Sequence, residues 1–305
     1  MSCTISSAKP SLGCRYSNDE EAAADGAASK KGHTVQEVIK VGVVAYDPKV
    51  VTIWEGIKEF FTERNVATDF VLFSNYDAQV AALLDGWIDT AWNTNLAYVK
   101  VHRRTQGKCG VLAMRDTDIG FTTKIVAGAG TGIETIRDLK GKRFALGSRD
   151  SGQAAILPAY FLKQNGIDPA KDLVTIRFDL DVGKHGDTGT SEVEVVNAVA
   201  TGEAHAGAIG DQYWARALSE GLVDNSKVRA IWTSNGYCHC NFTIRDKADE
   251  HRFARWTDVL LTMDYNKPDD RKIMDMEGLK RWVRPEMEGY RVLFEAVDDV
   301  GFFDN

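Results

Sequence analysis

Two short segments combine residue types that could bind a metal or catalyse a reaction. Residues 183–187 read GKHGD, so a cation, an imidazole and a carboxylate share a glycine-flanked loop, and residues 237–241 read YCHCN. Histidine, thiolate and carboxylate together are either ligands for a soft metal or parts of a nucleophilic site in which a base activates a cysteine. In the second case, we expect His185, Asp187 and Cys240 to be the catalytic residues.

The spacing of these residues does not decide whether they bind a metal. Neither segment matches a standard zinc motif. Alternate residues of an extended strand face one side, so we expect Cys238 and Cys240 to share a face and His239 to lie opposite them. An ordinary extended strand that connects two parts of the fold, with buried cysteines, explains residues 237–241 equally well. His185 has little core to join, so we expect it to face a ligand. The prediction is no cofactor, with a bound divalent metal as the alternative.

A third segment, Ser148–Gly152, lies where a predicted strand turns into a helix. Free backbone N–H groups at a helix N-terminus favour an anion. A carboxylate at Asp150 could cap the helix itself and would repel a doubly charged anion. The segment therefore predicts an anion site that disfavours a dianion.

Alternating strands and helices position these segments. Apolar periodicity predicts strands at 38–46, 68–73 and 88–92, with helices at 49–64 and 76–87 between them. After the glycine-rich residues 128–132 the pattern restarts, with strands at 143–147, 174–180, 205–209 and 228–234 and helices at 151–164 and 192–200. Pro158 should kink the first of these helices. Strand–helix–strand units with short connections require parallel sheets covered by helices, and residues 248–305 are expected to be mostly helical.

Ligands in open α/β sheets lie beyond the carboxyl ends of the strands. Applied to the predicted strands, this rule gives a set of candidate binding residues: Tyr46, Asn75, Trp92, Asn93, Thr94, Ser148, Arg149, Asp150, Ser151 and Asp211. To these we add Lys184 and His185 from the glycine-flanked loop and His239 from the crossing strand. The polar neighbours of Trp92 favour a cleft position over a core position for its ring, whereas Asn75 could equally be a turn residue.

Composition excludes several classes of protein. Of the 305 residues, 37 are basic and 44 acidic, so the net charge of −7 argues against a nucleic-acid partner. No apolar run is long enough to span a membrane. Residues 1–33 are expected to form a disordered tail without an export signal, which predicts a cytoplasmic protein. Ser11–Cys14 resembles a lipoprotein cleavage site, so a periplasmic or lipid-anchored location is the alternative if translation starts further upstream.

Five segments together resemble the phosphonate-type substrate-binding proteins of bacterial ABC transporters, which have the periplasmic-binding type II fold. They are Val41–Tyr46, Asp85–Trp92, Ile136–Arg143, Ser148–Gly152 and Gly202–Ala208, within roughly residues 38–250. The resemblance implies two α/β lobes that close around a small solute, with two crossings near residues 127–132 and 235–241. It also implies that the 148–152 corner holds a phosphonate or a similar oxyanion, although Asp150 departs from the Ser/Thr-rich corner of that family.

These observations predict a two-lobed α/β protein. Lobe 1 should comprise residues 34–127 and 242–305, with the C-terminal helices packed on it, and lobe 2 residues 128–241, each lobe with a mostly parallel sheet. The expected function is to bind a small polar or anionic solute in the cleft, with a membrane transporter as partner if the protein is exported. The alternative is a cytoplasmic enzyme on the same scaffold, a cysteine- or metal-dependent hydrolase or lyase of a small heterocyclic or thio-compound.

Overall fold

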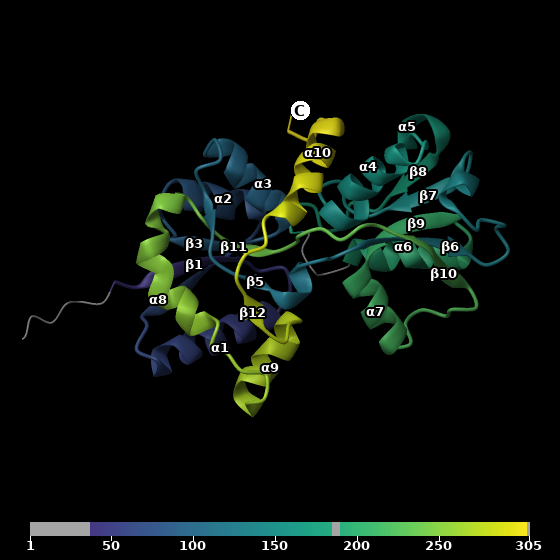
Figure 1. Cartoon of the computed structure of the whole chain (residues 1–305). Helices are drawn as coiled ribbons and strands as arrows, with labels where there is room; N and C mark the ends of the chain where they lie inside the picture. Colours follow the sequence, from purple (N-terminus) through teal and green to yellow (C-terminus); the bar gives the residue numbers. More distant parts are fainter. Residues whose placement is uncertain (1–36, 185–189, 304–305) are drawn as a thin grey trace, which may run out of the picture. The chain divides into compact units, whose positions relative to one another are not determined.

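A computed structural model describes residues 37–184 and 190–303 of the chain. The segment 1–33, expected to be a tail, lies outside the described residues, as do His185 and Asp187 of the glycine-flanked loop. The unit Gln36–Asn305 contains two five-stranded sheets, each the centre of one lobe (Figure 1).

The first sheet has the strand order β2-β1-β3-β11-β4. These strands span Thr68–Phe73, Ile39–Val44, Thr90–Asn93, Asn241–Ile244 and Gly110–Val111. One face packs against α1 (Lys49–Glu63), α8 (Glu250–Leu260) and α9 (Pro268–Glu277). The other packs against α2 (Tyr76–Leu84) and α3 (Asn95–Arg104). The expected strands and helices up to residue 92 are therefore present, whereas α3 was not expected.

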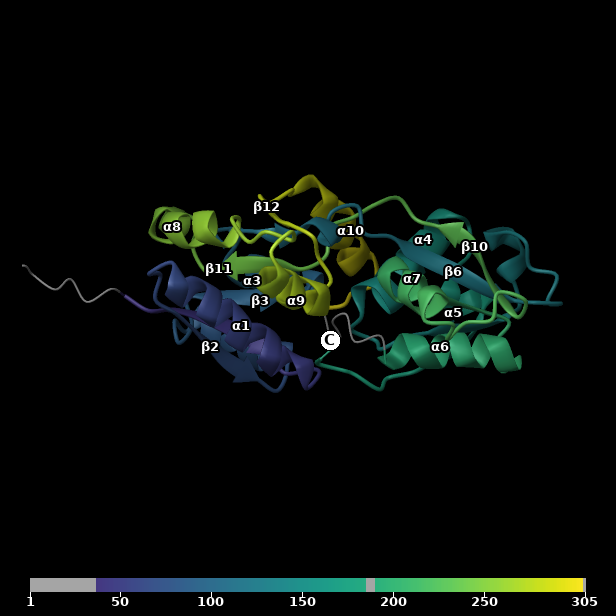
Figure 2. The same ribbon diagram turned by 90° about the horizontal axis from the view of Figure 1, so that it is seen from below.

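The second sheet has the order β10-β6-β9-β7-β8. These strands span Val228–Thr233, Thr123–Gly128, Ala206–Gly210, Arg143–Leu146 and Val174–Arg177. Helices α6 (Thr190–Thr201) and α7 (Asp211–Ser219) pack on one face. Helix α4 (Leu157–Gln164) and the short helix η2 (Ile136–Leu139) pack on the other. Figure 2 shows α6 and α7 in this lobe and α1 and β2 in the first.

The short elements complete the chain. They are η1 (Asp116–Asp118), α5 (Pro169–Asp172), η4 (Lys247–Asp249), η5 (Glu288–Tyr290) and a two-stranded sheet of β5 (Met114–Arg115) and β12 (Trp282–Val283). The helix expected at 151–164 has two parts, a π-helical turn η3 (Gly152–Ile156) followed by α4. Pro158 lies in the first turn of α4, where a missing N–H costs no hydrogen bond.

Both sheets are mixed rather than mostly parallel. In the first sheet β1 pairs in parallel with β2 and β3, but β11 runs antiparallel to β3 and β4. In the second, β7 is parallel to β8 and β9, whereas β6 runs antiparallel to β9 and β10. The antiparallel strands β11 and β6 each follow directly after a crossing. They therefore enter their sheet from the direction of the other lobe.

The chain passes between the sheets twice, at residues 116–122 (the first crossing) and 234–240 (the second crossing). Strand β6 pairs with β9 and β10, so the second sheet begins before the boundary expected after residue 127. The crossings run side by side: the Tyr237 N–H donates to the Phe121 carbonyl (2.9 Å) and the His239 N–H to the Asp118 carbonyl (3.0 Å).

The last helix, α10 (Arg291–Asp299), contacts both lobes. It packs against α3 of the first lobe and α4 of the second. Across the second contact, the Tyr160 hydroxyl donates to Glu295 (2.9 Å), and Lys163 pairs with Asp299 (2.8 Å). The expectation that the C-terminal helices pack on the first lobe therefore holds for α8 and α9 but is incomplete for α10.

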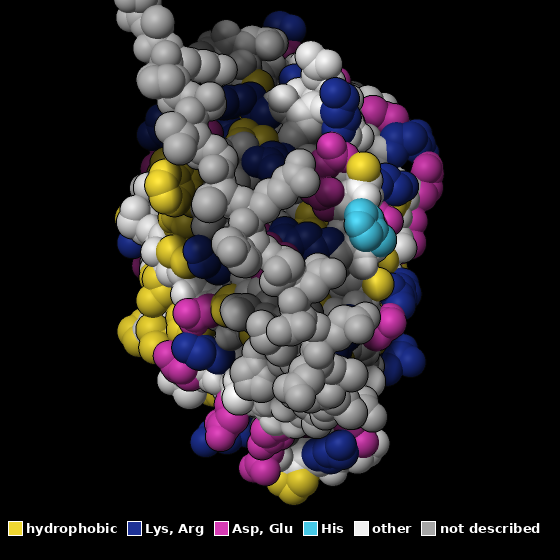
Figure 3. Space-filling model, turned by 90° about the vertical axis from the view of Figure 1, so that its left-hand side faces the viewer, with side chains coloured by type: hydrophobic (Ala, Val, Ile, Leu, Met, Phe, Trp, Pro, Cys, Tyr) yellow, Lys and Arg dark blue, Asp and Glu magenta, His cyan; other side chains and the backbone are white. Residues whose placement is uncertain are grey.

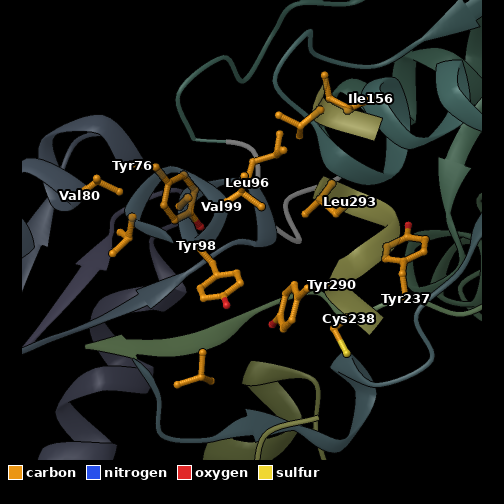
Figure 4. Packing of buried hydrophobic residues seen from close by; sticks show 14 of the residues in the cluster. Tyr76, Val80, Leu96, Tyr98, Val99, Ile156, Tyr237, Cys238, Tyr290 and Leu293 are labelled. Carbon is orange, nitrogen blue, oxygen red and sulfur yellow. The ribbon is translucent and has the colours of Figure 1, made fainter. Parts of the chain in front are cut away.

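An apolar cluster continues across the two lobes beside α10. Figure 4 shows Leu96 of α3, Leu293 of α10 and Ile156 of η3 lying near one another, and all three belong to one buried cluster. Deeper in the same cluster the rings of Tyr98 and Tyr290 lie 4.7 Å apart. Because this surface is buried between elements of both lobes, it stabilises the pairing of the lobes as well as each lobe alone.

The outer face of the first lobe carries charges of both signs. On the uncovered parts of that face, Figure 3 shows Lys, Arg, Asp and Glu side chains interspersed, with apolar side chains gathered along one edge. Several large apolar side chains of this lobe are exposed, including Val71 and Leu72 of β2 and Trp87 after α2. Trp87, the last residue of the helix expected at 76–87, lies beyond the end of α2 and is 75% exposed.

Phe242 of β11 should be a main contributor to the stability of the first lobe. Its ring lies 4.7–6.0 Å from the rings of Trp54, Trp92, Trp256 and Trp282. We expect Phe242→Ala to lower the free energy of unfolding by about 3–5 kcal/mol, through lost burial and the cavity left behind. Urea denaturation measures this loss. Leu222→Ala, at a 61% exposed position, is the control and should change it by less than about 0.5 kcal/mol; equal effects would contradict the packing.

Candidate functional site

Two helix N-termini meet between the lobes. Helix α3 begins after Thr94, whose hydroxyl accepts the Ala97 N–H (3.4 Å), and η3 begins after Ser151, whose hydroxyl accepts the Ala154 N–H (3.1 Å). A Cβ atom on Gly152 would lie 2.6 Å from Oδ1 of Asn95. Only glycine therefore allows this approach. We call the meeting of residues 93–95 with residues 151–152 the amide corner.

The amide corner contains two fully buried asparagines, Asn93 and Asn95. The Oδ1 atom of Asn95 accepts the Leu96 N–H (2.8 Å), and that of Asn93 accepts Nε2 of Gln79 (2.9 Å). Within the described part of the chain, neither Nδ2 group has a hydrogen-bond partner. Buried N–H groups are strong donors when an acceptor reaches them, so each amide retains donor capacity that the protein does not use. Asn95 was missed in the sequence, where residues 93–95 look like a turn.

Ser148, Arg149 and Asp150 hold the connection that follows β8. The Ser148 hydroxyl is hydrogen-bonded to the Asp181 carboxylate, and the exposed Arg149 guanidinium pairs with Asp179 at 2.8 Å. Asp150 accepts the Gly183 N–H through Oδ2 (2.7 Å). Ser148 and Arg149 thus stabilise a connection within their own lobe. Asp150, the residue before Ser151 of the corner, accepts a hydrogen bond from the loop at Gly183.

The same loop reaches the first lobe. The Gly183 carbonyl accepts the Tyr76 N–H (2.9 Å) at the start of α2. Asn75 caps that helix by accepting the Ala78 N–H (2.8 Å), and its Cβ would lie 3.3 Å from a Cβ on Gly183, whose φ is +81°. Asn75 is therefore a cap that also lies at the contact between the lobes. Lys184 is exposed.

A cavity of about 330 Å³ lies between the lobes, and residues 93–95 and 151–152 of the amide corner do not line it. Both lobes line it, and Gln153, the neighbour of Gly152, and Tyr46 contribute to its wall. Its charged lining residues are of both signs: Lys49, Arg115, Glu192, Arg216, Asp275 and Glu277. Tyr46, a predicted binding residue, thus lines the same cavity as residues of α6, α7 and α9. The sequence did not indicate those residues, because they are distant from Tyr46 in the chain.

Asp211 and Trp92 have structural contacts. Asp211 begins α7 and accepts both the N–H (3.2 Å) and the hydroxyl (2.8 Å) of Thr122, which ties α7 to the first crossing. The Trp92 ring is 4% exposed and lies in the core, 4.7 Å from Phe242. The polar neighbours that favoured a cleft position belong to the opposite face of β3.

His239 and Cys240 of the second crossing form a buried cluster rather than facing opposite sides. The His239 Nδ1 lies 3.0 Å from the Cys240 Sγ, and its Nε2 lies 3.2 Å from Oε1 of Gln153. The imidazole also stacks on Phe121, with the ring centres 4.5 Å apart. Cys238 lies apart, its thiol donating to the Glu286 carbonyl (3.3 Å), and burial together with the Glu286 carboxylate raises the pKa of that thiol. The alternation rule failed here because residues 238–240 are not in a regular strand.

A buried ion pair that the sequence did not predict completes this cluster. Arg115 donates from Nε to Oδ2 and from Nη2 to Oδ1 of Asp118, both at 2.7 Å. The Asp118 Oδ1 also accepts the Cys240 N–H (3.0 Å). Burial alone would raise the pKa of Asp118, but the Arg115 guanidinium and His239 outweigh it and lower the pKa to about 2. Asp118 is therefore ionised at neutral pH.

Residues 43–290 match the family model described as "ABC transporter, phosphonate, periplasmic substrate-binding protein". The chain belongs to this family. A sequence relative from Prochlorococcus marinus, described as a probable ABC transporter phosphite binding protein, is 24% identical over 249 residues, which is 78% of this chain and 80% of the relative.

Solved structures of similar fold agree with the two-lobed architecture. PhnD1 of Prochlorococcus marinus in complex with methylphosphonate has a TM-score of 0.67 and 22% identity, covering 87% of this chain and 98% of that chain. The aliphatic sulphonate binding protein SsuA of Escherichia coli has a TM-score of 0.55 and 18% identity, covering 86% and 83%. At these identities the likeness shows the fold, so the predicted periplasmic-binding type II class is confirmed.

Membership of the family confirms the predicted function: this phosphonate-type substrate-binding protein binds a small polar or anionic solute between its lobes. The predicted cytoplasmic location is wrong, because the family is periplasmic. Proteins of this class typically need no cofactor, and their partners are a small solute and a membrane transporter. None of the comparisons favours the enzyme interpretation. Among the described helices, none has the length and apolar character of a membrane span.

Replacing Asp118 should reveal how much this substrate-binding protein depends on its buried ion pair. We expect Asp118→Asn to lower the free energy of unfolding at pH 7 by about 3–5 kcal/mol, because Arg115 is left buried without its counter-charge. Denaturant unfolding measures the loss. Asp258→Asn, which removes one partner of an exposed pair with Arg284, is the control and should change stability little.

The same ion pair should make the free energy of unfolding depend on pH. The pKa of Asp118 is lowered in the folded protein to about 2, whereas in the unfolded chain it is near 4. The ionised carboxylate therefore contributes fully to stability above pH 4, and this contribution is lost as the pH falls toward 2. We expect the stability difference between the parent and Asp118→Asn to narrow by about 2 kcal/mol between pH 5 and pH 2. Unfolding measured across that range tests this, and a constant difference would contradict the assignment.

Proposed function

We propose that the chain is the solute receptor of an ABC importer for small tetrahedral oxyanions of the phosphonate class, held at the amide corner. The observation that carries the proposal is the buried Asn95 amide, which lies against the backbone of Gly152 with its Nδ2 group available to an acceptor. The solute would be gripped by one group from each lobe, so binding favours closure of the cleft.

The electrostatics of the corner support an anion. The positive ends of the α3 and η3 dipoles both point into it, which favours negative charge. Asn93, Thr94 and Ser151 add neutral donors, so the solute would be bound mainly by oriented dipoles. Relatives described as binding phosphite, methylphosphonate and sulphonate fit the same chemistry.

The charge of the solute is limited by Asp150. Its carboxylate holds the Gly183 N–H and lies beside the corner, so it would repel a second negative charge more strongly than the first. We therefore propose a preference for singly charged oxyanions. The adjoining cavity, with charges of both signs, leaves space for the polar remainder of a solute. Tyr46 would line that space, and Asn75 would act at the contact of the 183 loop with α2.

Capture of the solute needs no resident cofactor in this proposal. The corner donors are amides, hydroxyls and backbone N–H groups, which bind oxyanions without a metal. A membrane transporter would receive the solute when the lobes open. The divalent metal considered from the sequence would belong to the crossings, away from the corner.

A charge placed in the corner should abolish binding. We expect Asn95→Asp to weaken methylphosphonate affinity at least about tenfold, because the new carboxylate opposes the anion and removes a donor. Asn225→Asp, which adds the same charge at an exposed loop, is the matched control and should leave affinity unchanged. Titration calorimetry with methylphosphonate, phosphite, methanesulfonate and phosphate measures these affinities. Parent-like binding by Asn95→Asp would overturn the site.

Because Asn95→Asp could disturb folding, a second variant tests the other lobe. Ser151→Ala removes a cap and a donor at the corner, and we expect it to weaken methylphosphonate affinity at least about tenfold, the loss of one hydrogen bond to a charged group. Asp246→Ala removes an equivalent cap from η4, far from the corner, and should not change affinity. Equal effects of the two variants would point to a general loss of stability.

Binding should also bring the lobes together. A solute that contacts Asn95 and Gly152 at once stabilises the closed arrangement over an open one. We expect small-angle scattering to show a smaller radius of gyration with saturating methylphosphonate than without it, and no change for Asn95→Asp. An unchanged radius in the parent, at a concentration where calorimetry shows saturation, would contradict closure.

A further inference from the structure

We propose that Asp118, His239 and Cys240 form a binding site for a zinc-like divalent transition metal at the point where the two crossings meet. Nδ1 of His239 and Sγ of Cys240 are 3.0 Å apart, and Nδ1 is 3.6 Å from Oδ1 of Asp118. All three potential ligand atoms lie within 4.8 Å of one another. The site is independent of the amide corner.

These separations suit one metal ion. Zinc binds sulfur at about 2.3 Å and nitrogen or oxygen at about 2.0–2.2 Å, which in tetrahedral geometry places ligand atoms about 3.3–3.6 Å apart. The distances from Nδ1 of His239 to Cys240 Sγ and to Asp118 Oδ1, 3.0 and 3.6 Å, lie within about 0.3 Å of that range. The sulfur and the carboxylate, at most 4.8 Å apart, would move together when an ion binds. A nitrogen, a sulfur and an oxygen donor favour zinc or cobalt over hard cations such as magnesium.

Asp118 can bind a metal without losing Arg115. Its Oδ1 accepts from Arg115 Nη2 (2.7 Å) and from the Cys240 N–H (3.0 Å), so a metal would replace one of these contacts. Oδ2 keeps the bond from Arg115 Nε (2.7 Å). A carboxylate that binds a metal with one oxygen and a guanidinium with the other is held in position by the second contact.

The charge of the buried surroundings also favours a cation. Arg115, Asp118 and Glu277 are at most 5% exposed, and they sum to one negative charge when the thiol and imidazole are neutral. A divalent metal that displaces the Cys240 proton to solvent adds one net positive charge and brings the sum to zero. Burial makes such compensation favourable, because an uncompensated charge is costly away from water.

A metal here would join the two crossings. Asp118 belongs to the first crossing and His239 and Cys240 to the second, so the ion would cross-link them. The remaining nitrogen of His239, Nε2, lies against Gln153 in the wall of the cavity. Metal binding at Nδ1 fixes the proton on Nε2 and so fixes this contact. The site would stiffen the crossings and orient Gln153.

Cobalt titration of the whole chain tests the proposal. The protein is reduced, stripped with a chelator and titrated with Co²⁺, then with Zn²⁺. We expect one equivalent of Co²⁺ to give the near-ultraviolet absorption of a thiolate–cobalt bond, with release of protons, and Zn²⁺ to abolish it. Cys240→Ser should remove the absorption, and His239→Gln should weaken Co²⁺ affinity at least about tenfold.

Cys238→Ser is the matched control, because Cys238 is fully buried one residue from His239 and its thiol contacts Glu286 instead. It should retain the absorption; its loss in Cys238→Ser but not in Cys240→Ser would overturn the assignment. A measurement on the parent needs no variant: X-ray absorption of the zinc-loaded protein should show one sulfur ligand at about 2.3 Å. A spectrum without sulfur, or no binding at one equivalent, would overturn the site.

Discussion

The ion pair of Arg115 with Asp118 is the constraint on which the two-lobed arrangement depends. Asp118 accepts both N–H bonds of Arg115 and the Cys240 N–H, and its carbonyl accepts the His239 N–H, so one residue of the first crossing fixes two of the second. Arg115 in turn donates to the Glu277 carbonyl at the end of α9 (2.8 Å). Without the pair, the Asp118 carboxylate would lose the contact that holds it beside the Cys240 N–H, and the register of the crossings would rest on backbone bonds such as that of Tyr237 with Phe121.

Much of the fold could be predicted because most of its parallel strands and the helices between them have strong local patterns. Val41 and Ile53 lie in segments whose periodicity alone indicates a buried strand and an amphipathic helix. Strands β6 and β11 were not predicted, since each is defined by pairing with distant strands. The mixed sheets follow from those two strands. Helix α3 was missed because Asn93–Asn95 has the composition of a turn, and only the cap from Thr94 and the packing of Leu96 decide otherwise.

The site was predictable in part, for a different reason. The rule that ligands lie beyond strand ends found Thr94 and Ser151, which cap the two helices that meet at the amide corner. It also selected Trp92, because sequence adjacency cannot tell which face of β3 becomes core. Asn95, Arg115 and Asp118 were not found, since their importance comes from contacts between residues far apart in the chain, such as Asn95 with Gly152. Local pattern predicts elements well, whereas a site between lobes depends on long-range contacts.

The close approach of Asn95 to Gly152 also sets how narrow the cleft can become. A methyl group at residue 152 would lie 2.6–3.1 Å from the end of the Asn95 side chain, so with alanine there either the amide must swing aside or the lobes must separate. In the site proposed above, the first change would remove a donor and the second would widen the gap that an anion has to span. We therefore expect a larger residue at position 152 to shift the receptor toward wider solutes.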